Sequence, residues 1–129
     1  MEIASRLTEL RAVKQATRAF VEQAGLRPQA AFDWVLAVHE IVANAIVHGN
    51  RGEATKRVWI AFEVADEHVV ATVRDEGAGF DHAAAFADGR QAREQPAASG
   101  RGLLLVSHLV DEIAFADSGR TVTIRKAIR

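Results

Sequence analysis

Glu40, Asn44 and His48 recur at four-residue intervals within and just after an apolar stretch, residues 30–47. On an α-helix such residues lie almost one above the other, so the three side chains would form one polar stripe. Most of the remaining positions are Phe, Trp, Val, Leu, Ile or Ala, which predicts a helix buried on most sides. Because a buried carboxylate or amide is costly without partners, the stripe could face a cavity that holds a polar ligand. A solvated stripe or a hydrogen bond between helices would explain so short a pattern equally well.

Two glycine motifs follow the polar stripe along the chain. The first, Asp-Glu-Gly-Ala-Gly at residues 75–79, comes directly after a predicted strand, where glycines let a ligand approach the backbone closely. Asp75 there can accept a hydrogen bond from an amino group on a planar ring. The second, Ser-Gly-Arg-Gly at residues 99–102, immediately precedes a predicted helix, whose free N–H groups and positive dipole end favour a phosphate. Each motif alone is an ordinary turn or helix entry, but the ordered combination is much harder to attribute to chance.

Apolar periodicity predicts two helices and a hairpin in the first part of the chain. The first helix runs from about Thr8 to Gly25, and the second from about Gln29 to His48, where the loop at residues 49–52 ends it. Residues 57–64 and 69–75 are rich in Val, Ile, Phe and Trp. The short polar segment between them indicates an antiparallel hairpin.

The second part of the chain is predicted to hold a buried helix at residues 103–110 and strands at residues 113–116 and 121–125. Residues 81–99 are mostly small or polar and are predicted to form a partly helical, mobile loop. Strands that come in consecutive pairs predict an α+β fold. We expect a two-layer α/β sandwich, in which a mixed, mostly antiparallel sheet is covered by helices on one face. With 129 residues, the chain is expected to form a single domain, residues 1–129.

The composition is that of an ordinary soluble globular protein, with 49% hydrophobic and 26% charged residues. A formal net charge of -1 gives no reason to expect nucleic acid or an anionic membrane as a partner. The absence of cysteine excludes disulfides, thiolate metal sites and thiol catalysis. The first ten residues lack the apolar segment of a signal peptide, and no apolar run is expected to be long enough to span a bilayer. We therefore expect a cytoplasmic protein.

The order of the motifs resembles the GHKL ATP-binding superfamily, which has the Bergerat fold. The resemblance rests on Glu40-xxx-Asn44-xx-Val47-His48-Gly49, then Asp75-x-Gly77-x-Gly79-Phe80-Asp81, then Gly100-x-Gly102-Leu103, with Asp111-Glu112 and Gly119-x-Thr121-Val122 behind. Within the superfamily, the chain looks most like the stand-alone anti-sigma factor serine kinases of the RsbW and SpoIIAB type. The likeness covers nearly the whole chain.

This resemblance implies ATP and Mg²⁺ as cofactors and a role for each matching residue. Glu40 would be the catalytic base that takes a proton from the attacking hydroxyl, and Asn44 would hold the Mg²⁺ that bridges the phosphates. Asp75 would bind the adenine amino group in a pocket shaped by Gly77 and Gly79. A hard cation such as Mg²⁺ prefers oxygen ligands, and phosphoryl transfer needs mainly positioning and charge neutralisation.

The remaining motif residues would surround the phosphates and the base. The resemblance implies that Gly100 and Gly102 contact phosphates, that residues 81–99 form an ATP lid and that Thr121 lies near the adenine. Leu103 and His48 belong to the same motifs and are counted with the nucleotide-binding residues. His48 is explained as well by a structural role, because a cation is favourable at the end of a helix.

Two features depart from the family pattern. Arg101 stands where the family more often has an apolar or small residue, and it could add a phosphate contact or face solvent. The predicted lid has no lysine, so help at the γ-phosphate would come from Arg90, Arg93 or Arg101.

Three functions compete for this chain. The first is a protein serine/threonine kinase that sequesters a sigma factor or a similar regulator and phosphorylates an anti-sigma factor antagonist of the STAS type. The second is a binding module whose ATP only sets its shape or affinity. The third is the catalytic part of a histidine-kinase system. A histidine kinase normally carries a phosphoacceptor histidine, and the first predicted helix contains no histidine, which argues against this third function. The presence of Glu40 favours the kinase. The sequence does not reveal the oligomeric state, although proteins of the type it resembles are commonly dimers, which makes a homodimer possible.

Overall fold

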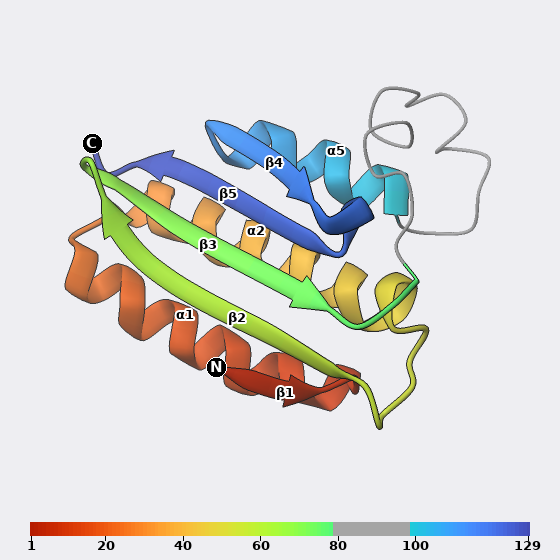
Figure 1. Ribbon diagram of the computed structural model, residues 1–129. Coiled ribbons are helices and arrows are strands. Elements are labelled where there is room, and N and C mark those ends of the chain that lie inside the picture. Colours follow the sequence, from red (N-terminus) through yellow and green to blue (C-terminus); the bar gives the residue numbers. More distant parts are fainter. Residues whose placement is uncertain (79–98) are drawn as a thin grey trace.

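The computed structural model describes residues 1–78 and 99–129 (Figure 1). In chain order, the elements are β1 (Glu2–Ala4), the 3-10 turn η1 (Leu7–Glu9), α1 (Leu10–Ala24), α2 (Pro28–Asn44), the π-helical turn η2 (Ala45–Gly49), β2 (Arg57–Ala65), β3 (His68–Asp75), α5 (Ser99–Leu109), β4 (Glu112–Ala116), the 3-10 turn η3 (Asp117–Gly119) and β5 (Thr121–Ala127). Gly79 and residues 81–98 of the predicted lid, with Arg90 and Arg93, lie outside the described residues.

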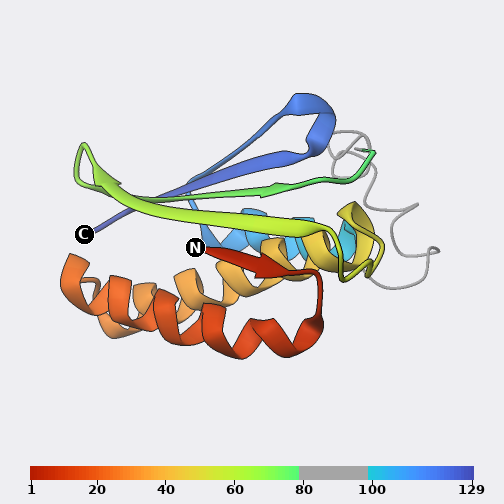
Figure 2. The same ribbon diagram turned by 60° about the horizontal axis from the view of Figure 1, so that its bottom comes forward.

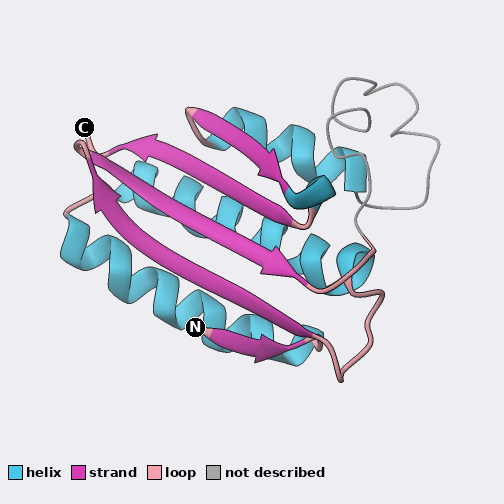
Figure 3. Cartoon of the chain, viewed as in Figure 1, coloured by secondary structure: helices cyan, strands magenta, loops and turns pink. Residues whose placement is uncertain are grey.

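The strands form one sheet in the order β1-β2-β3-β5-β4 (Figure 3). Every pairing among the described strands is antiparallel, so the expected mixture with parallel strands is not found there. The helices α1, α2 and α5 lie together on one face of the sheet (Figure 2). The predicted α+β two-layer sandwich is therefore confirmed.

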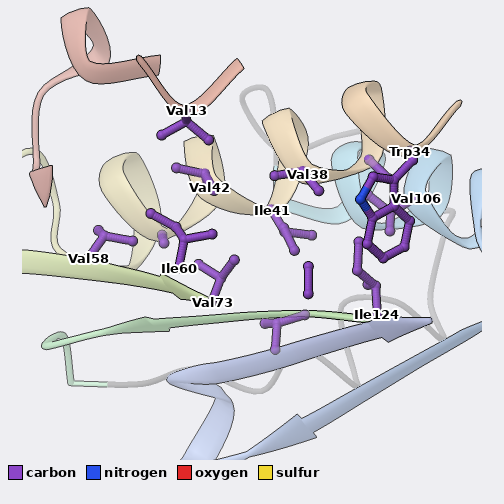
Figure 4. Close-up of a cluster of buried hydrophobic side chains, with 14 of the residues drawn as sticks. Val13, Trp34, Val38, Ile41, Val42, Val58, Ile60, Val73, Val106 and Ile124 are labelled. Carbon is purple, nitrogen blue, oxygen red and sulfur yellow. The ribbon is translucent and has the colours of Figure 1, made fainter. Parts of the chain in front are cut away.

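The core lies between α2 and the inner face of the sheet (Figure 4). Alternate residues of β2, β3 and β5 point towards the helices, as the period of two along a strand requires. The apolar stretch of α2 supplies the opposite surface, and its Trp34 is fully buried. The largest fully buried side chains of this core include Trp34, Ile41, Ile46, Ile60 and Ile124. Burial of this kind is the main favourable contribution to folding, and it fixes α2 against the middle of the sheet.

Two elements differ from the expectations. The strand β1 was not predicted, because three residues of which only Ile3 is a buried apolar side chain give no periodic signal. The helix α5 begins at Ser99, four residues earlier than the predicted start at Leu103. Glycine is a poor helix former, so Gly100 and Gly102 suggested a loop, but close packing of Gly102 against α2 overrides that local preference.

The expectation that no apolar run is long enough to cross a membrane is wrong, because one helical segment is long and apolar enough by the criteria of length and composition alone. The continuous helical segment Pro28–Gly49 has a mean hydropathy of 1.5 over an 18-residue window. Of that window, 44% is buried inside the fold, because α2 covers the sheet. A buried core helix of a globular protein passes the same test, so the observation is weak support for a membrane span.

Candidate functional site

The helix α2 ends at the polar stripe, and the chain continues into a π-helical turn. Asn44 is the last residue of α2 and is 7% exposed. In the following turn, η2, the N–H of Asn50 donates to the carbonyl oxygen of Ala45 at 2.8 Å, a bond across five residues. Such π turns are rare and occur frequently at functional sites. The stripe therefore ends in an irregular backbone that brings the following loop towards the sheet.

Gly102, in the first turn of α5, lies against two members of the polar stripe. A Cβ atom added to Gly102 would come 3.1 Å from Glu40 Oε2 and 3.4 Å from Asn44 Nδ2. The backbone of α5 thus approaches the carboxylate and the amide so closely that a Cβ at this position would require a small shift of Glu40. Three residues from two separate motifs, predicted to act at one site, meet at this point.

Asp75 is placed at the end of β3 by contacts with two glycines. It is 7% exposed, and its Oδ1 accepts a hydrogen bond from the N–H of Gly77 at 2.8 Å. A Cβ added to Gly49 would come 2.2 Å from Asp75 Oδ2, and one added to Gly77 would come 1.9 Å from the carbonyl oxygen of Gly49. Two backbone segments therefore close around the carboxylate at positions where only glycine fits.

Burial raises the pKa of Asp75 above its ordinary value of 3.8. The hydrogen bond from Gly77 and the charges of Arg120 and Lys56 act in the opposite direction and lower the pKa, but burial is the largest effect. A carboxylate that has lost water in this way gains from a hydrogen-bond donor on a ligand. Its second oxygen, Oδ2, has no hydrogen bond from the described residues.

A small cavity lies between Asn44 of the polar stripe and Asp75 at the end of β3. Its volume is about 10 Å³, room for about one water molecule. Asn44 lines it from α2 and Asp75 from β3, and Arg120 borders it before β5. The other lining residues are apolar and are Ile41, Ala45, Val73, Leu103 and Val122. The cavity is too small for an aromatic ring, so a base could enter between these apolar walls only after the lining side chains move apart.

The other predicted residues are distributed around this cavity. Leu103 lines it directly, whereas the hydroxyl of Thr121 donates to Asp117 Oδ2 at 3.0 Å and Thr121 is not among the lining residues. His48 is half-buried in η2, with Nε2 buried and without a partner in the described part of the chain. The backbones of Gly100 and Arg101 belong to the first turn of α5.

The arrangement fits the two cofactors implied by the motifs. Residues 99–101 open α5, and the N–H groups at this position of a helix have no acceptor within it and suit phosphate oxygens. The buried amide of Asn44 has an Nδ2 without a partner among the described residues, next to a carboxamide oxygen of the kind that Mg²⁺ binds. No group of three His, Cys, Asp or Glu that could hold a metal occurs in the same residues. A metal at Asn44 would therefore share its coordination with phosphates and water.

One residue at the site was missed by the sequence analysis. Asn50 is 0% exposed, and its side chain contacts the backbone between Asp75 and Gly77. In the sequence it lies in a Gly-Asn-Arg-Gly stretch that indicates only a loop, so no local pattern distinguishes it.

Comparison with known proteins shows which family the chain is similar to. The family model described as "Histidine kinase-like ATPase domain" matches residues 3–126. The anti-sigma F factor of Geobacillus thermodenitrificans is 33% identical over 98 residues, which is 70% of this chain and 65% of the relative. That of Bacillus subtilis is 29% identical over 96 residues, 69% of this chain and 64% of the relative. The serine-protein kinase RsbW of Listeria innocua is 26% identical over 113 residues, 82% of this chain and 71% of the relative.

The chain thus spans slightly less than two thirds of the length of these anti-sigma F factors. Among solved structures, the histidine kinase domain of the blue-light activated histidine kinase EL346 from Erythrobacter litoralis has a TM-score of 0.57 at 18% identity. The match covers 95% of this chain and 60% of that one, and it supports the fold. With a family match over nearly its whole length, the chain belongs to the histidine kinase-like ATPase domain family.

Proposed function

We propose that the protein binds Mg-ATP and acts as a protein serine/threonine kinase and anti-sigma factor. Its substrate would be an anti-sigma factor antagonist of the STAS type, and it would sequester a sigma factor or an equivalent regulator in the cytoplasm. The observation that carries this proposal is the contact of Gly102 with Glu40 and Asn44, which joins a base, a metal ligand and a helix N-terminus. The names of the anti-sigma F factors and of RsbW support the choice of partners.

Each part of the site has a distinct task in this proposal. Asp75 accepts a hydrogen bond from the adenine amino group, and the apolar walls of the cavity hold the ring. The N–H groups in the first turn of α5 bind phosphate oxygens, and Asn44 binds the metal through its amide oxygen. When bound, Mg-ATP supplies the phosphoryl group that is transferred. Glu40 takes the proton from the hydroxyl of the protein substrate, because its carboxylate lies beside Asn44 and Gly102.

Nucleotide binding is tested first, by thermal unfolding. A ligand that binds only the folded state stabilises it, by about 2.7 kcal/mol at a free concentration one hundred times Kd. We expect Mg-ATP to raise the melting temperature. ATP with a chelator should raise it less, because no metal then joins Asn44 to the phosphates. No shift with millimolar Mg-ATP, in protein shown to be folded, would contradict the proposal.

Kinase activity is tested with partners recovered from a lysate of the source organism, with and without ATP. Mass spectrometry then determines whether a recovered protein carries phosphoserine or phosphothreonine, and purified partner is labelled with γ-phosphate from ATP. Transfer to an antagonist supports the kinase. If no antagonist that binds the protein is labelled, but the affinity for the sigma-like partner still changes with ATP, the protein is a nucleotide-gated binding module.

A further inference from the structure

Asn50 is the buried junction of four segments around the candidate site. Its Nδ2 donates to Ser5 Oγ at 2.7 Å and to the carbonyl oxygen of Arg57 at 2.9 Å. Its Oδ1 accepts from the N–H of Glu76 at 2.8 Å. Since Asn50 follows η2 directly, one side chain joins the end of the α2 segment to the chain after β1, to the start of β2 and to the loop after β3.

The contact with Glu76 bears directly on the carboxylate that is proposed to read adenine. Glu76 lies between Asp75 and Gly77, and the N–H of Gly77 donates to Asp75 Oδ1. The backbone of this short segment therefore sets the direction of the carboxylate. Neither Glu76 nor Ala78 is buried, so the segment has little apolar packing of its own. The hydrogen bond that the N–H of Glu76 donates to Asn50 Oδ1 holds this segment where apolar packing does not.

The partners of Asn50 are themselves fixed. Ser5 is 2% exposed, and its Oγ donates to the carbonyl oxygen of Lys56 at 2.8 Å. Asn50 uses both of its amide hydrogens and its oxygen, so its side chain has a single favourable orientation. A fully satisfied buried polar network of this kind is rigid, so it fixes the position of the backbone nitrogen of Glu76 that is bonded to Asn50.

We propose that Asn50 is a positioning residue for nucleotide recognition, which holds the backbone at Glu76 so that the Asp75 carboxylate faces the 6-amino group of adenine. This inference rests on the proposed function, since it assigns to Asn50 the selectivity for the base. A residue that only holds the fold together would change stability and the binding of every nucleotide alike. A residue that aims Asp75 changes the preference for adenine.

The test compares the binding of ATP with that of ITP, which carries an oxygen in place of the 6-amino group. We expect the parent to prefer ATP by about tenfold or more, the equivalent of one well-placed hydrogen bond to a charged group. Asn50→Ala should lose most of that preference while its affinity for ITP changes little. Ser5→Ala is the matched control, because it removes another bond of the same network and leaves the bond from Glu76 to Asn50 intact.

A second pair of variants tests the same bond from the other side, at an exposed position that is less prone to unfolding. Glu76→Pro removes the N–H that Asn50 accepts, and Glu76 does not have the positive φ that proline cannot adopt. Glu76→Ala keeps that N–H and removes only the side chain, whose Oε1 accepts from the N–H of Arg57. We expect Glu76→Pro to lose the preference for ATP and Glu76→Ala to keep it.

The outcomes separate this inference from the proposed function. If the parent binds neither nucleotide, or binds both equally, the assignment of Asp75 to adenine fails. If the parent prefers ATP and folded Asn50→Ala keeps the same preference, Asn50 has no positioning role. Should Asn50→Ala not fold, the Glu76 pair decides, and equal ATP preference in Glu76→Pro and Glu76→Ala would overturn the inference.

Discussion

The backbone of Gly49 touches the carboxylate of Asp75, at a distance that leaves no room for a side chain. A Cβ on Gly49 would lie 2.2 Å from Asp75 Oδ2 and 2.5 Å from Asp75 Cγ. The end of the α2 segment is thereby in direct contact with the end of β3. The polar stripe and the first glycine motif, whose nearest members His48 and Asp75 are 27 residues apart in the sequence, form one site through this contact.

Gly49→Ala should displace Asp75. Gly49 is not among the described residues with positive φ, so the cost comes from the clash and not from backbone strain. We expect a loss of about 1 to 3 kcal/mol in the free energy of unfolding, as for other overpacked sites, together with weaker ATP binding. Denaturant unfolding and ATP affinity measure the two effects. In an Asp75→Ala background the penalty of Gly49→Ala should largely vanish, and an undiminished penalty there would show that the clash lies elsewhere.

Asp75→Asn should separate stability from recognition. Because burial raises the pKa of Asp75 in the folded state, this group favours folding below its unfolded pKa, and that contribution is lost as the pH rises through the folded pKa. The parent should therefore lose stability relative to Asp75→Asn as the pH rises from about 3.8 towards neutrality, starting from the ordinary value. Melting temperatures of both proteins across this range measure the difference, and a parent that gains relative to the variant would contradict the sign.

The same substitution should weaken ATP binding at neutral pH. The acceptor proposed to face the adenine amino group becomes an amide with a donor of its own, and an unpaired buried group costs on the order of 1 to 3 kcal/mol. A drop of about tenfold in ATP affinity, measured by calorimetry, is expected. Unchanged affinity in this variant would mean that Asp75 does not read the base.

Sequence reasoning identified α1, α2 and the β2–β3 hairpin because each has many residues of one period, enough to outweigh single exceptions. It missed β1, which is too short for a period, and it placed the start of α5 too late because glycine disfavours helices. The π turn η2 was not predicted either, since no residue pattern encodes the extra residue in that turn. These misses share one cause, which is that tertiary contacts decide where local preference is weak.

Part of the candidate site was predictable as a set of residues, but its geometry was not. The four-residue spacing of Glu40 and Asn44 was enough to place both on one side of α2. That Gly102 would rest on this pair, or that Gly49 would touch Asp75, depends on how separate elements pack. Asn50 escaped notice for the same reason, because its three partner segments lie far from it or across a loop in the sequence.

Gly102→Ala should leave the fold intact and impair transfer. Alanine favours a helix over glycine by about 1 kcal/mol, so α5 itself should gain. The new Cβ, 3.1 Å from Glu40 Oε2, would push the carboxylate aside by a few tenths of an ångström, and small misplacements at a reacting group are costly. We expect an unchanged or higher melting temperature with about tenfold slower phosphoryl transfer. A variant that is both stable and fully active would show that Glu40 tolerates the displacement.

Glu40 and Asn44 should differ in what they contribute, although both contact Gly102. Removal of a general base typically costs about a hundredfold to ten-thousandfold in rate. A carboxylate beside a triphosphate does not favour its binding, so Glu40→Ala should bind Mg-ATP as well as the parent or better. It should also keep its sigma-like partner, because it no longer phosphorylates the antagonist. Asn44→Ala should instead weaken Mg²⁺-dependent ATP binding and transfer together, since the proposed metal ligand is lost.

The measurement is transfer of labelled γ-phosphate to the antagonist, run beside ATP affinity for the parent and the variants. Glu40→Gln is the matched control, because it keeps the shape that packs on Gly102 while removing the base, and it should behave like Glu40→Ala. If Glu40→Gln transfers phosphate at the parental rate, Glu40 is not the base. The alternative result is that the parent labels no antagonist that it binds, while Asn44→Ala abolishes an ATP-dependent change in affinity for the sigma-like partner. In that case the site controls partner binding and does not transfer phosphate. A carboxylate at position 40 would then matter only for packing against α5.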